Sequence, residues 1–167
     1  FKHDINIPLR YGVNQCIGDT HGVGGVFRAL RSIPVMNSIA ADMAELCPDA
    51  LLLNYTNPMS MLMWGMNAAV PEVSKVGLCH SVQGTAHQIA RWLGLPPNEV
   101  DYWVAGINHQ AWFLELTHKG RDLYPKLRKA LDNPEIVQKE TTRFELFRHF
   151  GYFVTESSGH NSEYVPW

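Results

Sequence analysis

Residues 50–93, ALLLNYTNPMSMLMWGMNAAVPEVSKVGLCHSVQGTAHQIARWL, decide the fold. Two short apolar runs, 50–55 and 72–78, each lead into a segment with helical periodicity, 59–70 and 82–93. Continuous apolar runs of this length are typical of strands buried in a parallel sheet. Strand, helix, strand and helix joined by short connections predict a doubly wound α/β sheet.

The segments on either side extend this prediction. Residues 26–46 have a helical pattern, which Pro34 is expected to interrupt. After residue 100 the pattern changes to two strands around an Asn108-His109 loop and then two amphipathic helices, at residues 102–105, 111–116, 124–131 and 142–150. We expect the two strands to pair in antiparallel, so that a second, mixed region follows the α/β part.

The composition excludes several classes of partner. The 167 residues carry a formal net charge of −2 with acidic and basic residues mixed, which argues against nucleic acid or an anionic membrane as the main partner. No apolar run approaches the roughly 20 residues of a transmembrane helix. Three widely spaced cysteines without a CxxC motif favour a reducing cytoplasm over a disulfide framework. Both ends of the chain interrupt a pattern, so we expect an internal piece of a longer protein.

A cysteine and a histidine follow two of the predicted strands. Cys79 ends the run that leads to Gly77-Leu78, and His109 follows the strand that ends near Ala105. Ligands gather at the carboxyl ends of strands in α/β proteins, and a thiolate with an imidazole can hold a divalent metal. The simpler interpretation is a buried thiol and a hydrogen-bonded core histidine.

Three polar segments have both a structural and a functional interpretation. The glycine-rich residues 18–25 precede a helix, where they bind an anion or form a flexible capping loop. Arg28 and Arg31 lie on one face of that helix, where they clamp an anion or form a solvated face. Asn54, Thr56 and Asn57 suit hydrogen bonds to sugar hydroxyls, or else turn formation before Pro58. The polar residues 155–160 are read as a surface loop on their own pattern.

Taken in order, five motifs resemble family 4 glycoside hydrolases. They are Gly18-Asp19-Thr20 with Gly24-Gly25-Val26-Phe27-Arg28, Asn54-Tyr55-Thr56-Asn57-Pro58-Met59, Gly77-Leu78-Cys79-His80-Ser81-Val82-Gln83-Gly84-Thr85, Ala105-Gly106-Ile107-Asn108-His109, and Gly151-Tyr152-Phe153-Val154-Thr155-Glu156-Ser157-Ser158. The match covers almost the whole chain. The third and fifth motifs are most similar to the α-galactosidase branch of the family.

The resemblance implies an incomplete Rossmann-like domain. We expect residues 1–100 to be the second half of a doubly wound sheet, without the N-terminal glycine fingerprint, and residues 101–167 to begin a mixed α+β catalytic or C-terminal domain. His21 and Val23 depart from the family's glycine loop, which alters its shape without removing its role. The 167 residues alone are expected to be inactive.

The resemblance also implies an unusual way of breaking a glycosidic bond. In this family NAD⁺ accepts hydride from C3 of the sugar, a base removes the acidified C2 proton, and the C1 leaving group departs by elimination. Water then adds and the hydride returns, which sets the family apart from glycosidases that use two carboxylates. A divalent cation, Mn²⁺, polarises the C3 ketone as a Lewis acid.

Carried over by position, the resemblance implies a role for each of several residues. Cys79 and His109 are the metal ligands, although Mn²⁺ ordinarily prefers oxygen donors. The substrate is bound by Asn57, Asn108, His80 and Arg28, and Asn54 lies nearer the nicotinamide. Tyr164 is the expected C2 base, with Glu156 as its competitor.

Other functions remain open from the sequence. The substrate of a family member of this kind is an α-galactoside, an α-glucoside or an α-glucuronide or galacturonide. A different class is an NAD-dependent 2-hydroxy acid dehydrogenase, which shares the Rossmann topology and has no need of Cys79. A third is a sugar-binding module without catalysis. The family resemblance implies a homo-oligomer, a dimer or a tetramer, and the cysteine pattern favours the cytoplasm.

Overall fold

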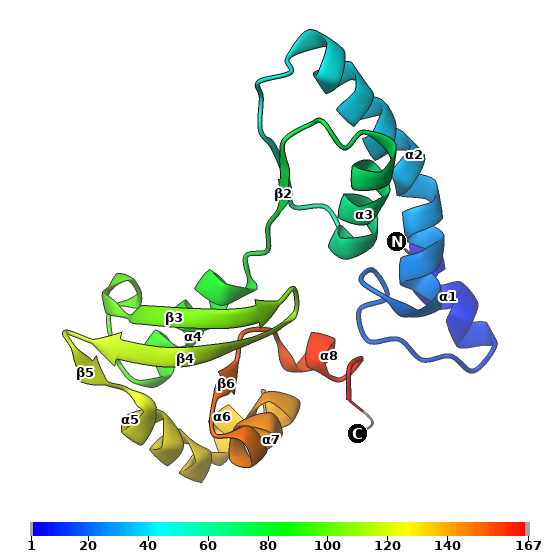
Figure 1. Cartoon of the computed structure of the whole chain (residues 1–167). Coiled ribbons are helices and arrows are strands. Elements are labelled where there is room, and N and C mark those ends of the chain that lie inside the picture. Colours follow the sequence, from blue (N-terminus) through cyan, green and yellow to red (C-terminus); the bar gives the residue numbers. More distant parts are fainter. Residues whose placement is uncertain (1, 166–167) are drawn as a thin grey trace. The chain divides into compact units, whose positions relative to one another are not determined.

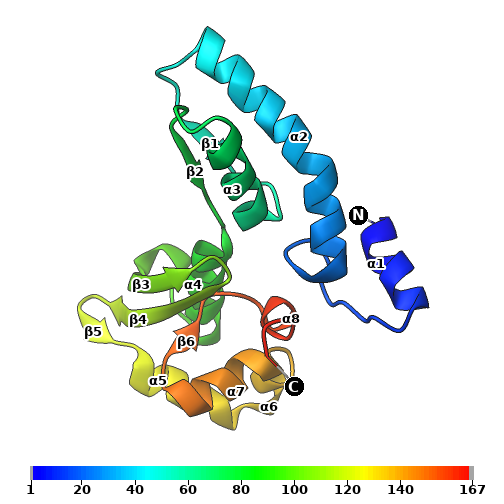
Figure 2. The ribbon, with the colours of Figure 1, turned by 45° about the vertical axis from the view of Figure 1, so that its right-hand side comes forward.

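The computed structural model describes residues 2–165. The chain forms two compact units, Phe1–Cys79 and His80–Trp167, each with its own sheet and apolar core (Figures 1 and 2). The α/β class predicted from the sequence is confirmed. The predicted division into domains at residue 100 stays a prediction. Among residues 2–165, no helix combines the length and apolar character that crossing a bilayer requires.

The first unit contains the predicted strand–helix–strand pattern. Its elements are α1 (Lys2–Arg10), α2 (Gly22–Leu46), β1 (Leu52–Asn54), α3 (Met59–Ala69) and β2 (Lys75–Gly77). The two strands pair in parallel, with Leu52 opposite Lys75 and Asn54 opposite Gly77, because α3 carries the chain back to the start of the next strand. Helix α1 was not predicted from the sequence.

Helix α2 corrects the expected interruption at Pro34. The helix is 25 residues long and continues through Pro34. Figure 1 shows it as one continuous ribbon. A proline in a helix interior costs about 3 kcal/mol through one lost hydrogen bond and a steric clash. We attribute its tolerance to packing, since Ala40 of α2 is fully buried in an apolar cluster that includes Met66 of α3.

The two strands of the first unit are less buried than their apolar sequences suggest. Leu52 and Asn54 face inward, whereas Leu53 is 57% exposed and Val76 of β2 is 37% exposed. The buried face packs into the cluster formed with α2 and α3. A parallel strand needs cover on both faces to be fully buried, and among the described residues only one face of this sheet has it.

The second unit is a mixed α+β arrangement. Its elements are α4 (Ser81–Trp92), η1 (Pro97–Glu99), β3 (Asp101–Ile107), β4 (Gln110–His118), β5 (Arg121–Asp122), α5 (Tyr124–Lys129), η2 (Ala130–Asp132), α6 (Pro134–Val137), α7 (Thr141–Phe150), β6 (Phe153–Val154) and α8 (Ser158–Asn161). Strands β3, β4 and β5 form an antiparallel meander, and β6 pairs with β4. The predicted antiparallel pair is confirmed, whereas β5 and β6 were not predicted.

The turn between β3 and β4 positions His109. Ile107 pairs with Gln110, so Asn108 and His109 alone connect the strands, and His109 adopts a φ of 60°. This left-handed conformation is uncommon outside glycine, though histidine is among the residues that adopt it more often. Gly106 has a φ of 138°, and a Cβ there would collide with the main chain of Gln110 and Ala111. The hairpin therefore requires a glycine beside the turn.

The pairing of β6 with β4 positions Glu156. Phe113 lies opposite Phe153 and Trp112 opposite Val154, and the N–H of Thr155 donates to the carbonyl of Ala111 at 2.9 Å. Glu156 is the next residue of the chain, and its Oε2 lies 3.3 Å from Nε2 of His109.

A buried tyrosine, Tyr124, stabilises the pairing of β4 with β6. The Tyr124 hydroxyl donates to the carbonyl of Phe113 on β4 and accepts from the N–H of Phe153 on β6. Phe113 and Phe153 are both fully buried, together with Phe144 on α7. Because one hydroxyl bridges both strands within a dense apolar core, β6 has a defined register despite its length of two residues.

Candidate metal centre

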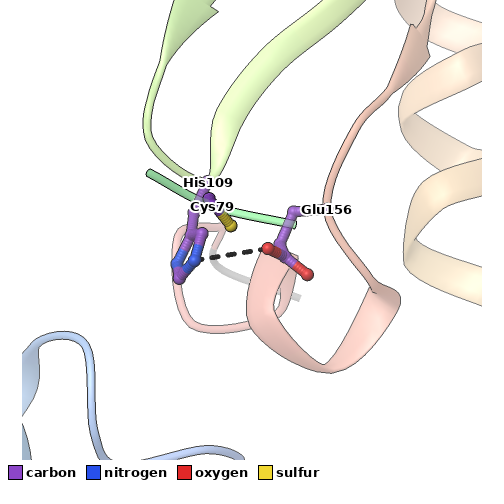
Figure 3. A group of neighbouring side chains, drawn as sticks. All are labelled: Cys79, His109 and Glu156. Carbon is purple, nitrogen blue, oxygen red and sulfur yellow. Dashed lines mark ion pairs between the residues drawn. The ribbon is translucent and has the colours of Figure 1, made fainter. Parts of the chain in front are cut away.

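Three potential metal ligands from distant parts of the sequence converge. Ligand atoms of Cys79, His109 and Glu156 all lie within 4.8 Å of one another, and Figure 3 shows their side chains pointing toward a common point. Cys79 lies in the short connection between β2 and α4. His109 comes from the β3–β4 turn and Glu156 from the segment between β6 and α8. The sequence predicted the first two as a pair, and the structure adds the carboxylate.

The carboxylate of Glu156 lies between two histidines. One oxygen, Oε2, is 3.3 Å from Nε2 of His109, and the other, Oε1, is 3.3 Å from Nδ1 of His160. The two imidazole rings are 4.5 Å apart between centroids. His109 is 4% exposed and Glu156 is 6% exposed, so these polar groups interact in surroundings that contain little water.

The electrostatics keep Glu156 ionised. Burial raises the pKa of Glu156, but hydrogen bonds from His160 and from the Ser157 N–H, with the charges of both histidines, outweigh burial and lower the pKa to about 2. The Ser157 N–H donates to Oε1 at 2.7 Å. A carboxylate held in its charged form is the state that binds a cation.

The donor set fits a divalent transition metal. Two neighbouring ligands of an octahedral ion, each about 2.1 Å from it, lie about 3 Å apart, which is close to the separation of His109 Nε2 from Glu156 Oε2. Imidazole and carboxylate suit Mn²⁺, and a thiolate suits softer ions. Three protein ligands leave positions for substrate oxygens, the arrangement typical of catalytic sites.

Comparison with known proteins decides the family. A family 4 glycosyl hydrolase model matches residues 1–95, and the model of the C-terminal domain of that family matches residues 104–166. The chain belongs to the family 4 glycosyl hydrolases. The resemblance seen in the five sequence motifs is confirmed.

Relatives within family 4 include α-galactosidases. The chain is 48% identical over 165 residues to an α-galactosidase of Bacillus subtilis and 44% identical over 172 residues to one of Rhizobium meliloti. An α-galacturonidase of Lachnoclostridium phytofermentans is 34% identical over 185 residues. The alignments cover 98%, 100% and 98% of this chain, but only 38%, 34% and 40% of the relatives. The family 4 chain therefore spans little more than a third of their length.

Solved structures share the fold of this family 4 chain. A putative glucosidase of Bacillus subtilis superposes with a TM-score of 0.84 at 27% identity, over 98% of this chain and 43% of the other. A 6-phospho-β-glucosidase of Thermotoga maritima, solved with manganese, NAD⁺ and glucose-6-phosphate, gives a TM-score of 0.75 at 24% identity, over 98% and 38%. The second likeness shows the fold alone.

The predicted ligand-binding residues of the first unit lie near its glycine-rich segment. Nε of Arg28 donates to the carbonyl of Asn57 at 3.0 Å, and Nδ2 of Asn57 donates to Asp19 at 3.5 Å. Asn54 is 2% exposed, and its Oδ1 accepts from the N–H of Thr56 at 3.0 Å. Arg28 and Asn57 are thus brought together, and the side chain of Asn54 forms the turn that the structural interpretation predicted.

The glycine-rich segment differs from the expected loop before residue 26. Helix α2 begins at Gly22, so Gly24 and Gly25 lie in its first turn. A Cβ on Gly24 would lie 2.5 Å from the carbonyl oxygen of Gly18 and 2.6 Å from that of Asp4. These glycines allow close main-chain packing at the helix start. Arg31 forms an ion pair with Asp4 of α1, in which Nη2 of Arg31 lies 2.8 Å from Oδ2 of Asp4.

The remaining predicted residues of this family 4 chain lie in the second unit. His80 is exposed at the start of α4, and Asn108 is half-buried in the same turn as His109. Tyr164 is half-buried after α8, and its N–H donates to the carbonyl of Asn161. Of the two residues that competed as the C2 base, Glu156 belongs to the cluster of three potential ligands. The assignment of the base stays a prediction.

One residue of the site was missed from the sequence. His160 contacts Glu156, and its ring lies tilted against the ring of His109, yet the surface-loop interpretation of residues 155–160 gave it no role. The helical i,i+4 spacing does not reveal this contact, because Glu156 lies before α8 and its N-cap Ser157.

Proposed function

We propose that this chain is the metal-binding portion of an NAD- and divalent-metal-dependent α-galactosidase. The observation that carries the proposal is the convergence of Cys79, His109 and Glu156 within 4.8 Å. The two α-galactosidases at 48% and 44% identity support the substrate. Manganese and NAD⁺ in the Thermotoga maritima relative support the cofactors.

The two cofactors would contribute different chemistry to the proposed reaction. When bound, NAD⁺ would supply the hydride acceptor for C3 of the sugar, and Mn²⁺ a Lewis acid for the oxygens on C2 and C3. Cys79 as thiolate, His109 and Glu156 would hold the cation. The protein's own part is to orient the sugar and to move one proton, the proton on C2.

Glu156 is proposed as a ligand of the cation and Tyr164 as the C2 base. A carboxylate whose pKa is lowered to about 2 is a poor base for a carbon acid near neutral pH, because proton transfer is most effective with a pKa near the working pH. A tyrosine, with an ordinary pKa near 10, is a stronger base once a nearby cation promotes its ionisation. A carboxylate ligand also fits the preference of Mn²⁺ for oxygen donors.

The remaining roles follow from the family motifs. We propose that Asn57, Asn108, His80 and Arg28 bind the substrate and that Asn54 lies toward the nicotinamide. The Arg28–Asn57 contact at 3.0 Å supports a joint role for these two residues. We also propose a cytoplasmic homo-oligomer, and three widely spaced cysteines without a CxxC motif agree with a reducing compartment.

One experiment tests the proposed reaction. The full-length protein is incubated in D₂O with melibiose, NAD⁺ and Mn²⁺, and the released galactose is analysed by mass spectrometry and NMR. Deuterium at C2 is expected, because removal of the C2 proton exposes that carbon to solvent. Hydrolysis of melibiose without deuterium at C2 would overturn the redox-assisted mechanism, and failure to cleave melibiose while cleaving another α-glycoside would overturn the substrate.

A further inference from the structure

A buried arginine lies behind the segment that carries Glu156. Arg143, in the first turn of α7, is 1% exposed, and its guanidinium carbon lies 4.8 Å from the centre of the Phe153 ring. A charge buried this deeply is costly unless it is paired and hydrogen-bonded. The hydrogen bonds and the ion pair of Arg143 therefore indicate its structural role.

Arg143 links helix α4 to the segment just before Glu156. Its Nη2 donates to the Thr85 hydroxyl at 2.6 Å and to the carbonyl of Val154 at 3.3 Å. The Thr85 hydroxyl in turn donates to the carbonyl of Thr155 at 2.5 Å. The two carbonyls immediately before Glu156 are thus both held, one by Arg143 and one through Thr85.

Glu140 holds the segment just after Glu156. Its Oε2 accepts from both the N–H and the hydroxyl of Ser158, at 3.2 and 3.0 Å, and lies 3.4 Å from Nη1 of Arg143. The Ser158 hydroxyl also accepts from the N–H of Arg143 at 3.2 Å, which satisfies one of the unpaired N–H groups at the start of α7. Gln88 bridges the pair, accepting from Arg143 at 2.6 Å and donating to Glu140 at 2.9 Å.

We propose that the buried pair of Arg143 and Glu140 is the positioning device of the metal centre, holding residues 154–158 on both sides of Glu156 so that its carboxylate faces His109. The inference rests on the proposed function, since it assigns these residues to the same site. Neither residue is among the three clustered ligands. Groups that orient a ligand in this way commonly change metal affinity about 10- to 100-fold when they are removed.

Charge is a second reason for an arginine at this position. Burial lowers the pKa of Arg143, while the charges of Glu140 and Glu156 raise it, so both carboxylates interact with the same guanidinium. The guanidinium offsets part of the negative charge of Glu140 and Glu156 while it remains out of reach of solvent.

The test uses two matched double variants, one at the start of α7 and one within it. Arg143→Met with Glu140→Leu replaces the buried pair by apolar side chains, a change that proteins often tolerate. Arg148→Met with Glu145→Leu makes the same change in an exposed pair with the same spacing, Arg148 Nη1 being 2.9 Å from Glu145 Oε2. Ser158→Ala removes only the hydroxyl link and serves where the first variant does not fold.

Two measurements are made on each variant of the full-length protein. Hydrogen exchange without metal reports the order of residues 155–158, and calorimetric titration with Mn²⁺ reports affinity. For the buried double variant we expect exchange in this segment to rise about tenfold or more, with protection in β3 and β4 retained, and the Kd for Mn²⁺ to rise about 10- to 100-fold. Ser158→Ala is expected to raise the exchange rate and the Kd for Mn²⁺ by smaller amounts. The exposed double variant is expected to change neither the exchange rate nor the Kd.

The two proposals fail in different ways. Absence of Mn²⁺ binding by the unmodified chain would overturn the metal centre, and the exchange measurement would still decide the positioning role. Unchanged exchange at residues 155–158 in the buried double variant, or in Ser158→Ala if that variant is needed, would overturn the positioning role. So would a metal affinity equal to that of the exposed control.

Discussion

Nε2 of His109 lies 3.3 Å from Oε2 of Glu156, and the register between β4 and β6 accounts for this proximity. His109 occupies a tight turn at the start of β4, and Glu156 follows β6 where that strand runs alongside. Both side chains are buried. A histidine and a carboxylate held in this way, with a thiol nearby, are the donor set that we propose binds a cation.

Removing the carboxylate tests whether Glu156 is a ligand. Glu156→Gln keeps the size of the side chain but loses the charge, so we expect the Kd for Mn²⁺ to rise more than about tenfold, or about 1.4 kcal/mol. Titration calorimetry on the full-length protein measures this, with the exposed Glu145→Gln as control. An unchanged Kd in Glu156→Gln would remove the carboxylate from the donor set.

Removing the thiol tests the sulfur donor. Cys79→Ser replaces a thiolate by a weakly acidic hydroxyl, so the Co²⁺-loaded chain should lose its sulfur-to-metal charge-transfer absorption, and the Kd for the metal should rise. Cys16→Ser alters an exposed free cysteine and should leave the spectrum unchanged. If the charge-transfer band persists in Cys79→Ser, the sulfur ligand is a different residue.

A tyrosine variant tests the assignment of the base. Tyr164→Phe deletes the acid–base group and keeps the ring, so in the full-length protein we expect the rate to fall by roughly 10²–10⁴ and C2 exchange to vanish. Affinity for Mn²⁺ should be unchanged. Near-normal C2 exchange in Tyr164→Phe, together with its loss in a Glu156→Gln variant that still binds Mn²⁺, would reverse the two roles.

Stability at alkaline pH reports on the tyrosine between β4 and β6. Burial raises the pKa of Tyr124 to about 12, above its ordinary value of 10. The folded state therefore favours the neutral phenol, which contributes stability below pH 10 that is lost as the pH rises toward 12. The free energy of unfolding of wild type should fall relative to Tyr124→Phe over this range.

The matched control for this prediction is Tyr11→Phe. Tyr11 is 83% exposed, so its removal should leave the slope of unfolding free energy against pH close to that of wild type. Parallel slopes for wild type and Tyr124→Phe between pH 10 and 12 would contradict the buried, neutral state of Tyr124.

The sequence predicts those parts of the fold that local patterns determine. The parallel strands around residues 52–54 and 75–77, the helices after them, and the hairpin that presents His109 all follow from apolar runs, periodicity and turn residues. The pairing of Cys79 with His109 follows from their places after strands. The continuity of α2 through Pro34 depends on tertiary packing and is therefore not visible in a local pattern.

The rest of the site depends on contacts between distant residues. Strand β6 has two residues and no apolar alternation to reveal it, and its register is fixed by Tyr124 from another element. Without β6 the sequence cannot place Glu156 beside His109. The same holds for Arg143, which looks like an ordinary charged residue of an amphipathic helix but is 1% exposed.

The central claim is that Cys79, His109 and Glu156 bind one divalent cation together. X-ray absorption spectroscopy of the full-length protein loaded with one equivalent of Co²⁺ tests it most directly, because sulfur and lighter donors scatter differently. The account predicts one sulfur in the coordination shell with nitrogen and oxygen donors, and loss of that sulfur in Cys79→Ser. A shell of nitrogen and oxygen alone in the unmodified chain would contradict it.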